Sequence, residues 1–479
     1  MSPVGAVAAV DLGSTSGSVM IGSVGPNELR LGEVARFSNT PVRIWDGDRA
    51  GLHWSAIELY QNVIAGLASA FVAEPELASV GVDTWAADYG LVRRGRILGM
   101  PFHHRDERTG VGVAITHSLI ERAALYQENG LQFLPFNSLY QLTVDRIDGI
   151  LAEAEVALLI PDLFTYWLSG ERITEVTNAS TTGLLNHDGT WNRDLMERLA
   201  FPRRLFPSLV LPGTEVGGLL PSALPEGISS SATVTTVGSH EHASAVVAVP
   251  MQSESAAYIS CGTWGLAGVE LDHPILTEQA RLANFTNERG VDGRIRFLRN
   301  VVGLWLLGES ARTWHAQGVK ADLPTLLARA ETLTAPQAVF DVNDPRFLPT
   351  GDIPGRIAGW YNEHGLPAPD SPEATVRAIV ESLAVAFADA VRTAETLSGH
   401  TVDIIHIVGG GSLNRLLCQL TADRSGLTVL AGPLEATALG NILIQARAHG
   451  FVSGDLVTLR ALVARAFPPI TYEPRSPSA

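Results

Sequence analysis

The sequence predicts an α/β protein built from two large domains. Its 479 residues are more than a single hydrophobic core usually supports. An apolar strand followed by a turn of small residues occurs near residue 7 and again near residue 258, which indicates two similar halves. We place the domains at residues 1–246 and 247–479, with the seam near residues 243–256.

The composition argues against several classes of partner. The chain has 34 basic and 50 acidic residues, and a formal net charge of −16 disfavours a broad surface for nucleic acid or anionic membranes. Cys261 and Cys418 show no metal or disulfide spacing, so we expect reduced thiols and a cytoplasmic location. We expect no signal peptide, because residues 1–10 lack a basic segment, and no apolar run long enough to span a bilayer.

The hydrophobic periodicity of the first half predicts alternating strands and helices. An amphipathic helix is expected over residues 52–71, because apolar side chains recur there at helical spacing and Ser55 and Glu58 form a capping box. Its apolar face is expected to contain Ile57, Tyr60, Ile64, Leu67 and Phe71. The other predicted elements are strands at 7–10, 19–24, 78–83 and 233–237, a helix at 161–168 and a surface loop at 212–231.

The second half begins with the same pattern as the first. Residues 258–270 repeat the strand, small-residue turn and strand of residues 7–22. Ser371 and Pro372 begin a long helix, which Gly399 is expected to end. The remaining predicted elements are a strand at 403–408 and helices at 413–423 and 437–449.

Three turns of small residues are suited to holding phosphate groups. They contain, in chain order, Gly13, Ser14, Thr15, Ser16 and Gly17, then Gly262 and Thr263, then Gly409, Gly410 and Gly411. Backbone N–H groups in tight turns form anion-binding concavities, and a carboxylate such as Asp11 at a strand end can hold Mg²⁺. A hairpin turn capped by Asp explains the first stretch alone equally well, but the three turns together indicate a nucleotide site.

These turns do not belong to the common nucleotide-binding motifs. The sequence has no Gly-Lys pair, which excludes a Walker A loop. Asn414 stands where a Rossmann fingerprint has its third glycine. The side-chain-free turn at 409–411 would instead suit an adenine or ribose lying against the backbone.

Polar clusters provide candidates for a general base and a sugar pocket. Glu241 follows a predicted strand near the seam and could act as a base, although its position alone is more typical of a surface carboxylate. The flanking histidines, His240 and His242, do not have zincin spacing, because Ser244 stands at the place of the second ligand. Residues 83–89 and 103–106 combine aromatic and polar groups as sugar pockets do, and a solvated loop with one core Trp is an equal alternative.

On these motifs the chain resembles the FGGY family of carbohydrate kinases, and within it the rhamnulokinase branch. The matching segments are 10–19, 39–43, 81–90, 132–137, 238–250, 285–307 and 407–450. The resemblance implies an actin/Hsp70/sugar-kinase fold, with two RNase-H-like α/β domains and an interdomain cleft. It also implies ATP and Mg²⁺ as cofactors, a ketose as substrate, and transfer of the γ-phosphoryl group to the 1-hydroxyl of L-rhamnulose.

The resemblance also assigns roles to individual residues. Glu241 would be the proton acceptor, and Asp11 would act in catalysis by holding Mg²⁺. The nucleotide would contact Gly13, Ser14, Thr15, Ser16, Gly17, Ser18, Gly262, Thr263, Gly308, Gly409, Gly410 and Gly411. The sugar would contact Trp85, Ala86, His104, Arg105, His240, Glu241, His242 and Asn300.

Four positions depart from the family pattern. Glu241 replaces an Asp and reaches roughly 1.5 Å further, while Ala86 replaces a Gly, Gly308 a Gln and Ser18 an Arg. They leave two alternatives open, which are a kinase for L-fuculose or L-xylulose and a non-catalytic sugar or nucleotide sensor. The expected partners are the ketose and ATP, with no nucleic acid or membrane, in a monomer or homodimer.

Overall fold

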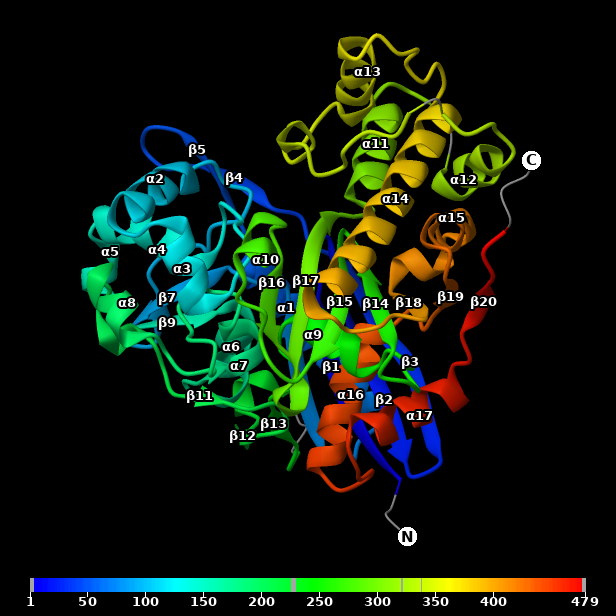
Figure 1. The fold of residues 1–479 in the computed structure, drawn as a ribbon. Coiled ribbons are helices and arrows are strands. Elements are labelled where there is room, and N and C mark those ends of the chain that lie inside the picture. The colour runs from blue at the N-terminus through cyan, green and yellow to red at the C-terminus, as the bar shows by residue number, and fades with distance from the viewer. Residues whose placement is uncertain (1–3, 225–229, 320–321, 337, 476–479) are drawn as a thin grey trace. The chain divides into compact units, whose positions relative to one another are not determined.

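Two compact units make up the protein. The computed structural model describes residues 4–224, 230–319, 322–336 and 338–475. The first unit consists of Met1–Ala248, Glu270–Phe297 and Ala436–Ala466, and the second of Val249–Val269, Leu298–Glu435 and Phe467–Ala479 (Figure 1). The sequence division at 246/247 differs from these units, because segments 270–297 and 436–466 belong to the first unit.

A six-stranded sheet forms the centre of the first unit. Its order is β12-β13-β6-β1-β2-β3, where β6 is parallel to both β1 and β13, and β2 is antiparallel to β1 and β3. The strands are β1 (Gly5–Leu12), β2 (Ser16–Gly25), β3 (Glu28–Ser38), β6 (Ser79–Thr84), β12 (Glu215–Gly218) and β13 (Thr233–Thr235). The parallel strands therefore end at one common edge. The predicted strands at 7–10, 19–24 and 78–83 are confirmed, and the one predicted at 233–237 is confirmed over 233–235.

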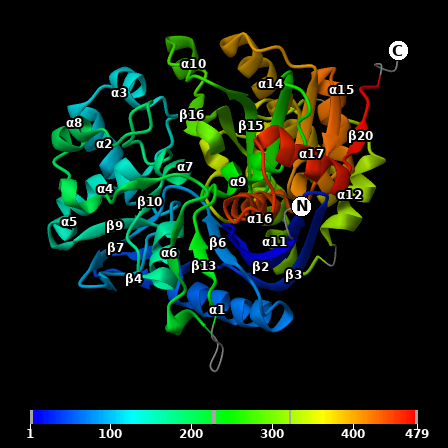
Figure 2. The same cartoon turned by 90° about the horizontal axis from the view of Figure 1, so that it is seen from below.

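Helices cover both faces of this sheet. On one face lie α1 (Ala56–Ala73) and α6 (Ile160–Ser169), and on the other lie α16 (Ala436–Ala448) and α9 (Glu241–Val247). Figure 2 shows α1 and α16 on opposite sides of β2. A Cβ on Gly22 would lie 2.3 Å from Ile442 of α16, so the sheet and this helix are in direct contact.

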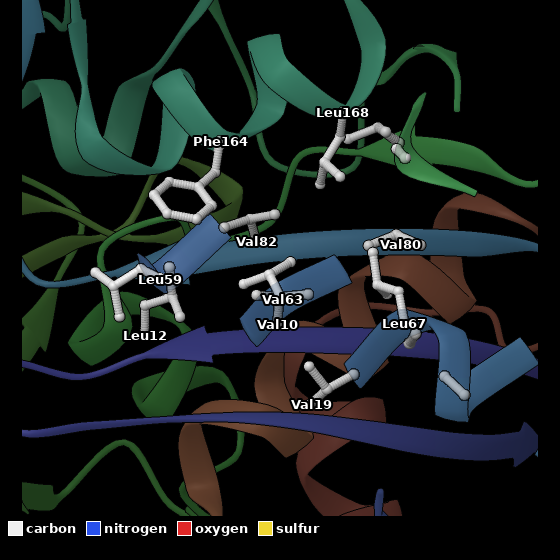
Figure 3. Close-up of a cluster of buried hydrophobic side chains, with 14 of the residues drawn as sticks. Val10, Leu12, Val19, Leu59, Val63, Leu67, Val80, Val82, Phe164 and Leu168 are labelled. Carbon is white, nitrogen blue, oxygen red and sulfur yellow. The ribbon is translucent and has the colours of Figure 1, made fainter. Parts of the chain in front are cut away.

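The core under α1 follows the two-residue period of the strands. Leu59, Val63 and Leu67 of α1 pack on side chains of β1, β2 and β6, and Phe164 and Leu168 of α6 complete the cluster (Figure 3). The strand residues in the cluster are Val10, Leu12, Val19, Val80 and Val82. Alternate residues along a strand point to opposite faces, so Ala8, Val10 and Leu12 all face this core.

The structure corrects the predicted helix at 52–71 in three respects. Residues Ala50–His53 form strand β5, which pairs with β4 (Val42–Trp45), and the helix begins only at Ala56. Ser55 is the N-cap, but its side chain makes no capping hydrogen bond. Ile57 is 49% exposed and does not join the apolar face, because the inward stripe passes through Leu59 and Val63 instead.

Helix α1 is the one helix in the described part of the chain with the length and apolarity needed to cross a membrane. This criterion uses only length and composition, and core helices of other proteins meet it as well. Leu59, Val63 and Leu67 of α1 lie in the core of the first unit.

Smaller elements complete the first unit, and two of them, α10 and β16, come from its 270–297 segment. They are β7 (Tyr89–Arg93), β8 (Arg96–Ile97), α2 (Thr109–Leu119), α3 (Arg122–Asn129), α4 (Ser138–Ile147), α5 (Ile150–Glu153), β9 (Val156–Leu159), β10 (Thr174–Glu175), α7 (Val176–Ala179), α8 (Arg193–Arg198), β11 (Leu209–Val210), α10 (Glu278–Leu282), β16 (Thr286–Arg289) and α17 (Leu456–Ala466). The predicted loop at 212–231 is wrong at β12, and its residues 225–229 lie outside the described part of the chain.

The second unit repeats the strand and turn arrangement of the first. Its strands follow the order β17-β15-β14-β18-β19-β20, with β14 antiparallel to β15 and parallel to β18. The elements are β14 (Ala256–Cys261), β15 (Trp264–Leu271), β17 (Ile295–Val302), α11 (Trp305–Ala316), α12 (Leu323–Glu331), α13 (Ile353–Glu363), α14 (Pro372–Ser398), β18 (Ile404–Val408), α15 (Arg415–Ser425), β19 (Thr428–Ala431) and β20 (Ile470–Tyr472).

The long helix α14 has the ends that its sequence predicts. Ser371 is the N-cap and its Oγ accepts a hydrogen bond from the Ala374 N–H at 3.2 Å. Gly399 ends the helix at φ 70°, a left-handed conformation that favours glycine. A Cβ on Gly265 would lie 2.4 Å from Phe387, so α14 packs closely on β15.

Candidate active site

Three carboxylates gather at the edge where the parallel strands of the first unit end. Asp11 of β1 and Asp83 of β6 are partners in the parallel register. The Thr84 N–H donates to the Ser239 carbonyl at 2.9 Å, which brings the segment leading to Glu241 to the same edge. The side chain of Glu241 reaches the first turn, since its Oε2 lies 3.4 Å from where a Cβ on Gly13 would be. The structure thus brings together Asp11, Gly13 and Glu241, as the sequence predicts.

Glu241 is in an environment that opposes its charged form. It is the first residue of α9, and its side chain is 19% exposed. Burial, and then the charge of Asp11, raises the pKa of Glu241 to about 8. A pKa close to the working pH makes the deprotonated form of this carboxyl a stronger base than an ordinary Glu, which favours its use as a general base.

Asp83 is a member of the cluster to which the sequence assigned no role beside Asp11. Asn441 of α16 donates its Nδ2 to Asp83 Oδ2 at 2.5 Å. The other oxygen, Oδ1, is buried and has no hydrogen-bond partner in the described part of the chain. Burial and the neighbouring Asp11 raise the pKa of Asp83 well above its usual range. Asp83 lies in a predicted strand, but its closeness to Asp11 depends on how β1 and β6 pair.

The first predicted phosphate loop is a short turn between β1 and β2. Asn39 holds two of its carbonyl groups, with Nδ2 donating to the Gly13 oxygen at 2.9 Å and the backbone N–H donating to the Thr15 oxygen at 3.0 Å. Ser16, Gly17 and Ser18 belong to β2, and Ser18 is buried opposite Asp11. The turn proper therefore consists of Gly13, Ser14 and Thr15.

Asp88 organises the predicted sugar-binding residues. Its Oδ2 accepts hydrogen bonds from Trp54 Nε1 at 2.6 Å, Trp85 Nε1 at 3.0 Å and the His104 N–H at 3.1 Å. His104 Nδ1 lies 3.2 Å from the same oxygen, and Gln141 Nε2 donates to Oδ1 at 2.8 Å. Asp88 lies in the stretch 83–89 that the sequence predicts as a possible sugar pocket, although no role was assigned to it, and Trp54 was not predicted as a site residue.

Replacing Asp88 with Asn should weaken sugar binding without affecting the nucleotide. The variant places an NH₂ group or a weaker acceptor where several buried donors converge, and a buried donor without its partner costs about 1–3 kcal/mol. We expect kcat/KM for the sugar to fall by roughly ten- to a hundredfold, while KM for ATP stays constant. Steady-state kinetics with Gln141→Leu as a control would test this, because that variant leaves the bonds to Oδ2 in place. It removes the bond to Oδ1 together with the bonds of Gln141 to the Ala87 and Phe136 oxygens and to Arg108. Equal losses in the two variants would contradict the role of Oδ2.

The histidines beside Glu241 are buried, and their environment favours the neutral form. His240 Nδ1 lies 3.1 Å from Arg296 Nη2 and 3.3 Å from Glu288 Oε2. Burial lowers the pKa of His240, and burial together with the charge of His240 lowers the pKa of His242 well below its usual range. Neutral imidazoles can donate and accept hydrogen bonds, as a polyhydroxy substrate requires. Arg296 and Glu288 were not predicted as site residues, although both lie in family-matching segments.

The other sugar candidates lie on the surrounding segments. Trp85 is buried, and its backbone N–H donates to the Leu12 oxygen at 3.3 Å. Ala86 and Arg105 are half-buried, and the Arg105 N–H donates to His103 Nδ1 at 2.9 Å. Asn300 is half-buried on β17 of the second unit.

Two predicted nucleotide turns meet within the second unit. The Gly262 N–H donates to the Trp264 oxygen at 2.8 Å, which closes the turn that carries Thr263 between β14 and β15. A Cβ on Gly409 would lie 3.0 Å from the Cys261 oxygen, and one on Gly411 would lie 2.5 Å from Cys261 Cβ. The glycine turn therefore packs directly on the end of β14, and larger residues at 409 or 411 would separate the two.

The loop before α11 also joins the second turn. The Leu304 N–H donates to the Gly262 oxygen at 2.9 Å, and the Trp305 N–H donates to the Thr263 oxygen at 3.2 Å. Gly308 lies on α11 with open space at its Cβ position, where the nearest atom is Arg312 Nη2 at 4.0 Å. Gly262, Thr263, Gly409, Gly410 and Gly411 are thus brought together, with Gly308 on the adjoining helix.

The donor set of the first unit fits Mg²⁺ bound together with phosphates. Within residues 4–224, 230–319, 322–336 and 338–475, no group of three or more His, Cys, Asp or Glu side chains forms a metal-binding cluster. Mg²⁺ usually keeps waters and uses one or two carboxylates plus substrate phosphates. Asp11, half-buried beside the turn of Gly13, Ser14 and Thr15, supplies a carboxylate of this kind.

Comparison with protein families identifies the chain. The N-terminal domain of the FGGY family of carbohydrate kinases matches residues 57–247, and the C-terminal domain of that family matches residues 257–449. The chain belongs to the FGGY family of carbohydrate kinases. It is thus a sugar kinase, which is a phosphotransferase.

Relatives of this FGGY kinase match it over almost its full length. The rhamnulokinase of Pectobacterium atrosepticum is 42% identical, over 98% of this chain and 94% of its own. The rhamnulokinase of Bacteroides thetaiotaomicron is 35% identical, over 98% of this chain and 96% of its own.

Solved structures share the fold of this kinase. The ligand-bound xylulose kinase from Lactobacillus acidophilus has a TM-score of 0.76 at 16% identity, covering 98% of this chain and 94% of its own. The glycerol kinase of Plasmodium falciparum with ADP has a TM-score of 0.78 at 13% identity, covering 98% and 94%. The predicted actin/Hsp70-like sugar-kinase fold is therefore confirmed.

Proposed function

We propose that this FGGY kinase transfers the γ-phosphoryl group of ATP to the 1-hydroxyl of L-rhamnulose. The observation that carries the proposal is the position of the Glu241 carboxylate, 3.4 Å from the Cβ position of Gly13 in the first phosphate turn. Relatives named rhamnulokinase, at 35–42% identity over nearly the whole chain, support the choice of sugar. The products are L-rhamnulose 1-phosphate and ADP.

Glu241 is the residue that accepts the proton in this reaction. The sugar hydroxyl gives its proton to a Glu241 oxygen, and the hydroxyl oxygen forms the new bond to the γ-phosphorus. The bond between the γ-phosphorus and the bridging oxygen of ADP breaks. Asp11 would hold Mg²⁺, which supplies charge neutralisation on the phosphates. The turns at 13–15, 262–263 and 409–411 position the nucleotide.

The remaining predicted residues bind and orient the sugar. The Asp88 carboxylate fixes the indole of Trp85 and the ring of His104, so both are held before substrate arrives. His240, held beside Arg296, offers its other ring nitrogen to a hydroxyl group. Asn300 is a further sugar contact in the proposal, and we expect a cytoplasmic enzyme that acts as a monomer or homodimer.

ADP release with Mg-ATP and a panel of ketoses tests the proposal. L-Rhamnulose should give the largest kcat/KM, with L-fuculose and L-xylulose as the comparison substrates. A preference for another ketose would reassign the sugar pocket while keeping the kinase. No turnover with any sugar, together with measurable ATP binding, would favour a sensor.

The raised pKa of Glu241 predicts an acid limb in the pH profile. A general base works only when deprotonated, so kcat/KM for the sugar should rise about tenfold per pH unit below the pKa. Without metal the pKa of Glu241 is about 8. A cation bound to Asp11 offsets the repulsion between Asp11 and Glu241, and therefore moves the pKa of Glu241 toward the usual value of 4.5. In assays from about pH 4 to 9, we therefore expect the acid limb of kcat/KM to have its midpoint between about pH 4.5 and 8. A limb below the usual Glu value would contradict the assignment.

A further inference from the structure

The first turn of α7 touches both of the segments that carry the proposed active-site residues. Residues 175–178 contact Ser239 and His240, which precede the base Glu241, and they also contact Trp85. None of these four residues has a role in the reaction as proposed above. All four are buried.

Glu175 is the centre of this arrangement. It is fully buried, and its carboxylate accepts five hydrogen bonds from three residues. The Ser239 N–H and Oγ donate to Oε2 at 3.1 and 2.6 Å. On the other side, the Thr177 N–H donates to Oε1 at 2.9 Å and the Asn178 N–H to Oε2 at 3.3 Å. A buried carboxylate satisfied by this many donors fixes the positions of all of them.

Thr177 and Asn178 extend the contact to His240 and Trp85. Thr177 Oγ1 donates to Glu175 Oε2 at 2.6 Å and accepts a hydrogen bond from the His240 N–H at 3.3 Å. Asn178 Nδ2 lies 3.3 Å from the Trp85 oxygen and 3.3 Å from the Ser239 oxygen. His240 is the N-cap of α9, so these bonds determine where the helix of Glu241 begins.

We propose that Glu175, Thr177 and Asn178 are positioning residues that set the proposed base Glu241 and the proposed sugar contact Trp85 in one geometry. The helix α9 has no side-chain capping bond at His240, and the α7 turn holds its start instead. A misplacement of about 1 Å at a reacting group can cost on the order of a hundredfold in rate. This inference rests on the proposed function, because it assigns Glu241 as the base.

Thr177 offers the sharpest test, because Val has nearly the same shape and lacks the hydroxyl. Thr177→Val removes the donor to Glu175 and the acceptor of the His240 N–H. We expect kcat for sugar phosphorylation to fall at least about tenfold, with KM for ATP changed less than about twofold. Thr177→Ser keeps the hydroxyl and should restore most of kcat.

A second buried threonine of the same unit provides the matched control. Thr143 is fully buried, and its Oγ1 donates to the Leu139 oxygen at 2.8 Å and pairs with Thr116. Thr143→Val should lower thermal stability to a degree similar to Thr177→Val and leave kcat unchanged. Equal kcat in wild type and Thr177→Val, or equal loss in both Val variants, would overturn the positioning role. Absence of ADP release by the wild type with every ketose would instead overturn the proposed function.

Discussion

Glu241→Gln should lower kcat by about 10²–10⁴-fold while ATP binding is retained. The amide keeps the size and burial of the side chain but cannot accept the proton of the attacking hydroxyl. ATP affinity should stay constant or rise, because a carboxylate beside the phosphate turn has been removed. Single-turnover kinetics and calorimetric ATP titration measure the two quantities separately. Turnover equal to that of the wild type would show that Glu241 is not the base.

The same variant gives a second result that does not depend on activity. Because the pKa of Glu241 is about 8 in the folded protein and near 4.5 when unfolded, the folded state holds an extra proton between these values. The resulting stability is complete below about pH 4.5 and is lost as the pH rises through about 8. Gln carries no charge, so the variant should be more stable than the wild type at about pH 9, by on the order of a few kcal/mol.

Glu241→Asp tests the departure from the family pattern. The shorter side chain withdraws the carboxylate by roughly 1.5 Å, in a site whose backbone is already held by the α7 turn. We expect activity between that of the wild type and Glu241→Gln. Activity above the wild type would show that the Glu side chain is misplaced for the substrate assayed.

Arg460→Met should lower the free energy of unfolding by about 3–5 kcal/mol. Arg460 of α17 is buried in the first unit, and its Nη2 donates to Glu270 Oε2 at 2.6 Å and to the Val246 oxygen at 3.0 Å. Removing the guanidinium leaves Glu270 buried without its charge partner and frees a carbonyl at the end of α9. Denaturant unfolding of the wild type and the variant at one pH measures the loss.

Two controls separate the buried ion pair from a general effect of losing an arginine. Arg203→Met breaks the ion pair between Arg203 and Glu197, whose side chains are 58% and 72% exposed, respectively. Because this pair is exposed, the variant should change the free energy of unfolding little. The double variant Arg460→Met with Glu270→Gln should recover part of the loss, because no buried charge remains without a partner. A double variant as unstable as the sum of the single variants would show that the two residues act independently.

Local patterns in the sequence were sufficient for most of the fold. The hairpin of β1 and β2 and the ends of α14 at Ser371 and Gly399 were predicted correctly, because periodicity and capping depend on residues close in the chain. The helix predicted to begin at residue 52 begins only at Ala56 because residues 50–53 pair with β4, and Ser55 is the N-cap but makes no side-chain capping hydrogen bond. Ile57 was misplaced for a different reason, since the face of α1 that is buried depends on what the helix packs against.

The sequence alone determined the three turns of small residues, the choice of Glu241 as the candidate base, and the family, since each depends on residue types at fixed short spacings. Only the tertiary structure decided which polar groups meet: Asp11 with Asp83, Asp88 with Trp54, and Glu175 with Ser239. The physical reason is that a buried polar group must find hydrogen-bond partners where the chain folds back on itself. Those partners come from segments far apart in sequence, and no local pattern specifies them.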